Sequence, residues 1–181
     1  MKPVLLTFAL ALAFHLTAAT LPNLEGETLA GSKLSLPTAL KGKTALLVIG
    51  FSKDSQKQTE AWGKRLKTEL PTLEVWSVVD LEAAPRLIRP MILRAMRSSM
   101  PKPQHDHFFI LTKGGKTLRP ALAYDSRAPQ NDDAYLALID PTGDITWQFH
   151  GPVSEAAVTA LRPNVRPPEG ARGSLSGSPV P

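Results

Sequence analysis

The four residues Ser52-Lys53-Asp54-Ser55 are the best placed in this sequence to bind a ligand, because they separate an apolar run from an amphipathic one. If these runs are a strand and a helix, the four residues lie where backbone amides and the helix dipole favour an anion or a carboxylate. A serine nucleophile needs a neighbouring base, and the loop contains no histidine. Ser52, Lys53, Asp54 and Ser55 are therefore anion- or ligand-binding candidates, and a plain helix cap is the alternative.

Histidines give a weaker candidate for a metal site. His105 and His107 flank Asp106, and in an extended segment their side chains would lie on the same side. His150 would have to approach from a later part of the chain. The spacing of these residues matches no metal-binding motif, so we expect no metal and no other cofactor.

A basic segment gives a third candidate. Residues 84–98 are predicted to form a helix, kinked at Pro90. The side predicted to face the core holds Leu87, Ile88, Met91, Ile92 and Ala95. The other side holds Arg86, Arg89, Arg94 and Arg97, with Leu93 and Met96 among them. This side is either a solvated basic face or a docking surface for an acidic protein partner or an anionic membrane.

The chain contains no cysteine. Because the thiolate is the nucleophile in thiol chemistry, thiol-disulfide oxidoreductase and cysteine peroxidase activities are excluded. An enzyme that uses other chemistry stays open, although the sequence favours a role without catalysis.

Composition is that of an ordinary globular protein. The chain has 181 residues, 43% of them hydrophobic, and a net charge of +5. This length suits one domain with a real core, and the positive charge suits contact with acidic surfaces. Without a long Lys/Arg block or an aromatic-rich basic patch, we expect no nucleic-acid partner.

Both ends of the chain differ from its centre. Lys2, the apolar run 4–16 and the small residues Thr17-Ala18-Ala19 predict that residues 1–19 are a signal peptide. The protein is then exported, to the periplasm if bacterial, and no transmembrane helix remains after cleavage. After a domain at 21–162, residues 163–181 are rich in Pro, Gly and Ser and are predicted to be disordered.

The domain itself reads as alternating strands and helices. The continuous apolar run 45–51 predicts a strand covered on both faces. Ser55 and Gln58 have capping-box spacing, and Trp62, Leu66 and Leu70 give the following helix a core-facing stripe. Further strands are expected at 73–79 and 107–112, then a hairpin of 135–139 and 145–149 around DPTGD, and a last helix at 155–161. The fold class is α/β.

This order, with LLVIGFS at 46–52 and YLALIDPTGDITWQFHG at 135–151, resembles the redoxin branch of the thioredoxin-like fold. The resemblance implies a three-layer α/β/α sandwich with a mixed central sheet and a C-terminal β-hairpin. A closer resemblance, through Trp62, the segment PRLIRPMILRAMRSSMP and Trp147, is to the mitochondrial ATP synthase assembly factor family and its bacterial relatives.

Two positions depart from redox-active members of the fold. The loop 52–56 holds no cysteine, and Ala134 stands before the fourth strand where those members carry a cis-proline. The resemblance then implies a non-catalytic binding or assembly-assisting, chaperone-like module acting on a membrane complex. The alternatives are an enzyme on the redoxin scaffold that uses non-cysteine chemistry, and a metal or anion carrier.

Overall fold

The structure, a computed structural model, describes residues 19–128 and 132–165. The strands are β1 (Ala19–Thr20), β2 (Leu24–Thr28), β3 (Lys33–Leu36), β4 (Ala45–Gly50), β5 (Glu74–Asp80), β6 (Phe108–Lys113), β7 (Tyr135–Ile139) and β8 (Asp144–His150). The α-helices are α1 (Gln56–Glu69), α2 (Arg89–Ser99), α3 (Gly115–Ala121) and α4 (Glu155–Val165). Two short 3-10 helices are η1 (Thr38–Leu40) and η2 (Lys102–His107).

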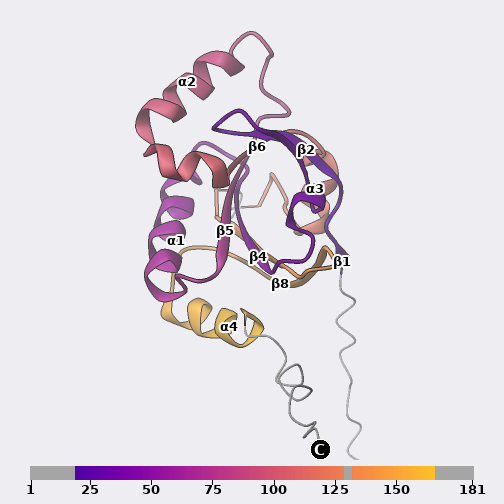
Figure 1. Cartoon of the computed structure of the whole chain (residues 1–181), viewed down its shortest axis with the longest axis vertical. Coiled ribbons are helices and arrows are strands. Elements are labelled where there is room, and N and C mark those ends of the chain that lie inside the picture. The colour runs from indigo at the N-terminus through magenta and orange to yellow at the C-terminus, as the bar shows by residue number, and fades with distance from the viewer. Residues whose placement is uncertain (1–18, 129–131, 166–181) are drawn as a thin grey trace, which may run out of the picture.

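All eight strands form one mixed sheet in the order β1-β8-β7-β4-β5-β6-β2-β3 (Figure 1). β4 pairs in parallel with β5, which pairs in parallel with β6, whereas β4 and β7 are antiparallel. Every residue of β4 is buried, as its unbroken apolar sequence predicts. β7 and β8 form the predicted C-terminal hairpin.

Helices cover both faces of the sheet, which confirms the expected three-layer α/β/α sandwich. Leu46 and Val48 of β4 pack with α1 and α4 on one face. Leu47 and Ile49 point to the other face, where α3 and the β2–β3 segment close a second core. A third, smaller cluster around Ile110 holds α2, which lies at the opposite end of the molecule from α4 (Figure 1).

Helix α1 has the predicted core stripe but not the predicted cap. Trp62 and Leu66 are fully buried, and the helix ends before Pro71. The capping-box prediction was wrong: the Ser55 side chain makes no cap bond and donates instead to the carbonyl of Ser52 (2.7 Å). Gln58 reaches across to residues 133 and 134 rather than back along its own helix.

Helix α2 differs from its prediction in both start and orientation. It begins at Arg89, so Pro90 lies in its first turn, where proline is tolerated, and does not kink the helix. Leu93 and Met96, expected among exposed arginines, pack with Ile92 against the core. The predicted core residues Leu87 and Met91 are exposed instead.

Two predicted end segments lie largely outside the described residues. The proposed signal peptide covers residues 1–18, which are not described, and Ala19, which pairs with Ile145 in β1. Helix α4 continues through Pro163 to Val165, so the first residues of the predicted tail are helical. Within 19–128 and 132–165, no helix has the length and apolar character needed to cross a membrane.

The β7–β8 turn is organised by the Asp140 side chain. Its Oδ1 atom accepts hydrogen bonds from the backbone amides of Thr142 (2.9 Å), Gly143 (3.0 Å) and Asp144 (3.0 Å). Partial burial opposes ionisation of Asp140, but these bonds and one from the Thr142 hydroxyl outweigh it and lower the pKa of the carboxyl below 3.8. Gly143 has a φ of 103°, a left-handed conformation that favours glycine.

We expect Asp140→Asn to lower the free energy of unfolding by about 1 kcal/mol at neutral pH. The neutral asparagine oxygen would accept weaker hydrogen bonds from the backbone amides than the carboxylate does. The folded pKa lies below the unfolded one, so the ionised carboxylate stabilises the fold above pH 3.8. This contribution disappears as the pH falls through the lowered folded pKa. Urea unfolding across this range should therefore show the two proteins converging at acid pH. Asp54→Asn is the control for loss of one charge, and a constant gap between wild type and Asp140→Asn at every pH would contradict the assignment.

Candidate functional site

The candidate site lies along one edge of the sheet, which we call the carboxyl edge. β4 and β5 are parallel, so Phe51 and Ser52, after β4, and Asp80, at the end of β5, lie on this edge. β7 is antiparallel to β4 and starts here, and His150 ends β8 opposite Tyr135. Ligands of α/β proteins bind at such edges, outside the carboxyl ends of parallel strands.

Ser52 is held by a carboxylate of the chain itself. Its hydroxyl donates to Asp132 Oδ1 at 2.6 Å and accepts the Ser55 backbone amide at 3.1 Å. The carboxylate of Asp132 thus lies beside the loop 52–55, which was predicted from the sequence to be a candidate anion-binding site. Ser52 and Ser55 lie together, with Ser55 1% exposed, whereas Lys53 and Asp54 are exposed.

Gly50 makes the close packing of Ser55 possible. A Cβ at Gly50 would lie 2.5 Å from the Ser55 hydroxyl oxygen, well inside contact distance. The two serines and the end of β4 therefore form a tight polar junction, with the Ser52 hydroxyl bonded to a carboxylate and no imidazole bonded to it within the described residues. The arrangement therefore differs from the serine–histidine pair in which an imidazole activates a serine nucleophile.

Gln58 ties helix α1 to the start of β7. Its amide oxygen accepts the Ala134 backbone amide (3.2 Å), and its amide nitrogen donates to Asp133 Oδ1 (3.2 Å). The other oxygen of Asp133 lies 3.1 Å from His150 Nδ1. Ala134 directly precedes β7, and its backbone amide is bonded to the side chain of Gln58.

A buried ion pair joins β5 to α3. Arg119 Nη2 lies 2.7 Å from Asp80 Oδ2, and the Asp80 side chain is 0% exposed against 33% for Arg119. Asp80 also accepts the Glu82 amide at 2.8 Å. A Cβ at Gly115 would lie 2.5 Å from Asp80 Oδ2, so a glycine is needed for this approach.

Aromatic rings pack against the guanidinium of Arg119. The guanidinium carbon lies 5.7 Å from the centroid of Phe51 and 5.8 Å from that of Tyr124, which are cation–π distances. The Phe51 and Tyr124 rings are 4.5 Å apart, and Tyr135 lies 5.3 Å from Phe51. Burial raises the pKa of Tyr135, and the negative charge of Asp133 adds to the effect, so this phenol stays neutral.

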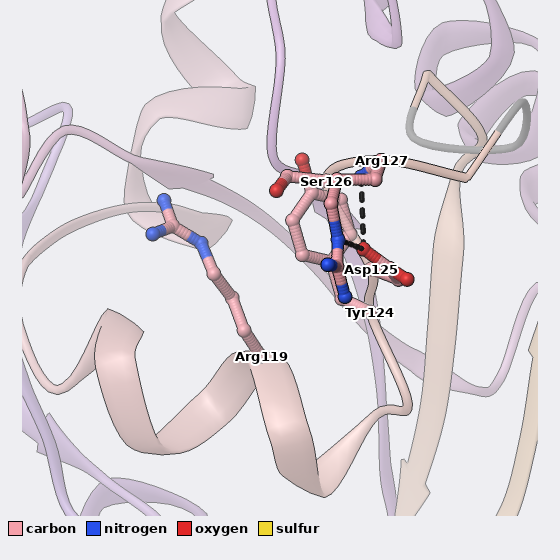
Figure 2. Close-up of a pocket in the computed structure, with 5 residues that line it drawn as sticks. All are labelled: Arg119, Tyr124, Asp125, Ser126 and Arg127. Carbon is pink, nitrogen blue, oxygen red and sulfur yellow. Dashed lines mark hydrogen bonds and ion pairs between the residues drawn. The ribbon is translucent and has the colours of Figure 1, made fainter.

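Beside this group is an open pocket of about 410 Å³. Figure 2 shows Arg119 projecting from α3 on one side and the loop from Tyr124 to Arg127 on the other. Asp125 Oδ1 accepts one hydrogen bond from the backbone amide of Arg127 (2.8 Å) and another from Nε of the same residue (3.3 Å). The pocket is thus lined by two arginines, one aspartate and two hydroxyl-bearing residues.

The three histidines do not come together. His105 lies in η2 rather than in an extended segment, and its Nε2 atom is 3.0 Å from the Met100 carbonyl. His107 packs against Trp76, before β6, whereas His150 ends β8 with β7, β4 and β5 between them. Within the described ranges, no cluster of three or more potential metal ligands exists.

The basic segment divides into structural and free arginines. Arg89 donates to the carbonyls of Glu82 and Ala84 (both 2.9 Å), and Arg97 donates to the Leu29 carbonyl (2.8 Å). The side chains of Arg86 and Arg94 are exposed and form no hydrogen bond or ion pair within the described part of the chain.

Sequence reasoning identified Ser52 to Ser55 but not the larger part of the carboxyl edge. Arg119, Tyr124 and Asp125 lie between the predicted strand 107–112 and the predicted hairpin, where no site residue was expected. The available signal was the position of Asp80 directly after the predicted strand 73–79, which places a polar residue at one sheet edge.

Fold and site together define a thioredoxin-like protein whose carboxyl edge carries hydroxyl, carboxylate and amide groups. BsSco, a member of the Sco family of cytochrome c oxidase assembly proteins, superposes with a TM-score of 0.56 at 15% identity, covering 82% of this chain and 95% of that one. The thioredoxin domain of a thiol-disulfide oxidoreductase from Bacteroides vulgatus gives 0.56 at 18%, covering 82% and 97%. Copper-bound yeast Sco1 gives 0.53 at 16%, covering 82% and 92%. These likenesses establish the fold.

The chain belongs to the ATP10 protein family, which matches residues 14–166. This match confirms the resemblance to the ATP synthase assembly factors read from the sequence. No curated protein matches the chain in sequence.

The Asp80–Arg119 pair gives a stability test of the carboxyl edge. We expect Arg119→Met to lower the free energy of unfolding by about 3 kcal/mol, because Asp80 is left buried without its counter-ion. The double variant Asp80→Asn with Arg119→Met should recover much of this loss, since no charge remains buried. Denaturant unfolding of the wild type, both single variants and the double variant measures the coupling. Strictly additive effects would show that the pair does not stabilise the fold.

Proposed function

We propose that this ATP10-family protein is an exported, non-catalytic module that assists assembly of a membrane complex by binding one of its subunits. The family match supports an assembly-assisting role. The absence of cysteine and the engaged Ser52 hydroxyl support a mechanism of binding without redox chemistry. The observation that carries the proposal is the exposed apolar surface at the start of α2.

This surface, the α2 ridge, consists of Leu87, Ile88 and Met91, which are 94%, 41% and 67% exposed. They are the large apolar side chains that the fold leaves exposed in residues 19–128 and 132–165. Contiguous exposed apolar side chains mark interaction sites. Because Ile92, Leu93 and Met96 of the same helix pack against the core, the ridge is displayed on a fixed support.

Charge indicates the chemistry of the partner. Arg86 and Arg94 flank the ridge and are free to pair, whereas Arg89 and Arg97 are occupied by backbone carbonyls. An apolar strip bordered by cations fits an amphipathic segment that carries Asp or Glu beside its own apolar face. We therefore place an acidic amphipathic segment of a protein subunit on the ridge.

We expect a photocrosslinking amino acid at position 88, in native envelope, to label such a partner. Leu87→Asp should weaken capture about tenfold or more, because a side chain that would be buried is replaced by a charge repelled by the acidic partner. Ala61→Asp adds the same charge on an exposed part of α1 and should change nothing.

Three results would count against the partner assigned to the ridge. Equal capture by the Leu87→Asp variant would remove the ridge from the interface. Capture that survives Arg86→Glu with Arg94→Glu would remove the acidic partner. Label found on lipid, with binding to anionic but not neutral vesicles, would identify a membrane surface as the occupant instead.

The other functions considered for the sequence have less support from the geometry. An enzyme with non-cysteine chemistry would need an activated group, and the Ser52 hydroxyl donates to the Asp132 carboxylate with no histidine or lysine bonded to it within the described residues. A metal carrier would need converging ligands, and His105, His107 and His150 lie in separate places.

Export rests on Lys2, the apolar run 4–16 and the small residues before Thr20. Cleavage after Ala19 would retain the bond from the Thr20 hydroxyl to Asp144 Oδ1 (2.7 Å). We expect N-terminal sequencing of protein recovered from a bacterial periplasm to begin near Thr20. Lys2→Glu with an arginine in the apolar run should keep the protein in the cytoplasm. Periplasmic recovery of that variant, or an uncleaved N-terminus in the wild type, would refute a cleaved signal.

A further inference from the structure

We propose that the open pocket beside α3, lined by Arg119 and the loop from Tyr124 to Arg127, binds a singly charged carboxylate of a peptide. This inference does not depend on the α2 ridge. It rests on the different states of the two arginines, on the net charge of the pocket, and on the backbone conformation that builds it.

Arg119 is a preorganised donor. Asp80 holds it from one side at 2.7 Å, and the Phe51 and Tyr124 rings lie 5.7 and 5.8 Å from its guanidinium carbon. The Asp80 contact uses Nη2 alone, and a third of the side chain remains exposed towards solvent. A guanidinium fixed in this way loses little conformational entropy when it donates to a ligand.

Arg127, by contrast, is available for recruitment. Its side chain is 90% exposed and is paired with Asp125, two residues away, over 3.3 Å. An exposed ion pair of this kind contributes about 0 to 1 kcal/mol, so its replacement by a ligand carboxylate costs little. The pocket therefore offers one fixed and one movable guanidinium, the arrangement that clamps a planar carboxylate.

The charge of the pocket favours a monoanion. Arg119 and Arg127 face it with Asp125, and Asp80 lies fully buried behind Arg119. These four groups sum to zero, so a single negative charge is better accommodated than the double charge of a phosphate. Tyr124, whose ring packs on Phe51, adds an apolar wall for the carbon atoms next to the carboxylate.

The backbone that forms the pocket is strained at one residue. Ala123 has a φ of 53°, a left-handed conformation that costs a non-glycine residue energy. This turn brings the Tyr124 amide to the Arg119 carbonyl at 2.9 Å and directs the chain back across α3. Strained backbone of this kind is found at binding sites, where the surrounding structure holds it.

The test follows the side-chain Nε–Hε resonances of arginine in the full-length protein by NMR. The probes are an acetylated tri-alanine peptide with a free C-terminal carboxylate, the same peptide as an amide, an acetylated amide with glutamate in the middle, and inorganic phosphate. We expect the free-carboxylate peptide to shift the Arg119 and Arg127 signals while the tri-alanine amide does not. If the glutamate peptide also binds, the pocket accepts side-chain carboxylates as well as C-terminal ones. If the glutamate peptide does not bind, the pocket is specific for C-terminal carboxylates.

Arg127→Glu should weaken this binding about tenfold without unfolding the protein, because the side chain is exposed. Lys67→Glu makes the same charge change on an exposed part of α1 and should leave the affinity unchanged. The proposal is wrong if the amide binds as well as the free carboxylate, if phosphate binds more tightly, or if Arg127→Glu and Lys67→Glu weaken binding equally, which would indicate general charge attraction. Loss of peptide binding with partner capture intact would separate this site from the α2 ridge.

Discussion

Burial of β4 on both faces is the constraint on which the rest of the molecule depends. A strand with no polar side chain needs a neighbour on each side and a helical layer above and below. β5 and β7 supply the neighbours, and Trp62 of α1 and Leu118 of α3 lie in the two covering layers. Because β5 runs parallel to β4 and β7 antiparallel, the end of β4, the end of β5 and the start of β7 meet at one edge. The polar groups of the carboxyl edge are brought together by this topology.

At that edge polar contacts join the strand and helix ends. Ser52 binds Asp132, and Gln58 binds the backbone at Ala134, so helix α1 and the start of β7 are joined by hydrogen bonds. In a partly buried setting, such bonds fix the relative position of two elements because leaving either partner unsatisfied is costly. These bonds hold the end of β4, the start of α1 and the start of β7 in a fixed arrangement at this edge.

Local sequence patterns were sufficient to predict the main strands and helices. Long-range contacts determine the polar pairs at the carboxyl edge and the orientation of α2, which local patterns did not predict. The apolar sequence of β4 and the turn residues around Asp140 predicted strand and hairpin correctly because the forces that form them act between near neighbours. The Asp80–Arg119 pair spans 39 residues and the Gln58–Ala134 bond 76, and no spacing rule connects such positions. The predicted orientation of α2 was wrong for the same reason, since Leu93 and Met96 pack against a cluster that contains Leu29, directly after β2, and Ile110 of β6.

The misread orientation of α2 bears on how the molecule works. A helical wheel assigns the more apolar side to the core, and here that side includes Leu87 and Met91, which the fold leaves exposed. With Leu93 and Met96 packed inward, the side chains of Arg89 and Arg97 donate to backbone carbonyls and orient the helix. The side chains of Arg86 and Arg94 take no part in this. In this orientation Leu87 and Met91 stay exposed. Because apolar surface is the main source of affinity in protein association, we assign the proposed binding role to this exposed side of α2.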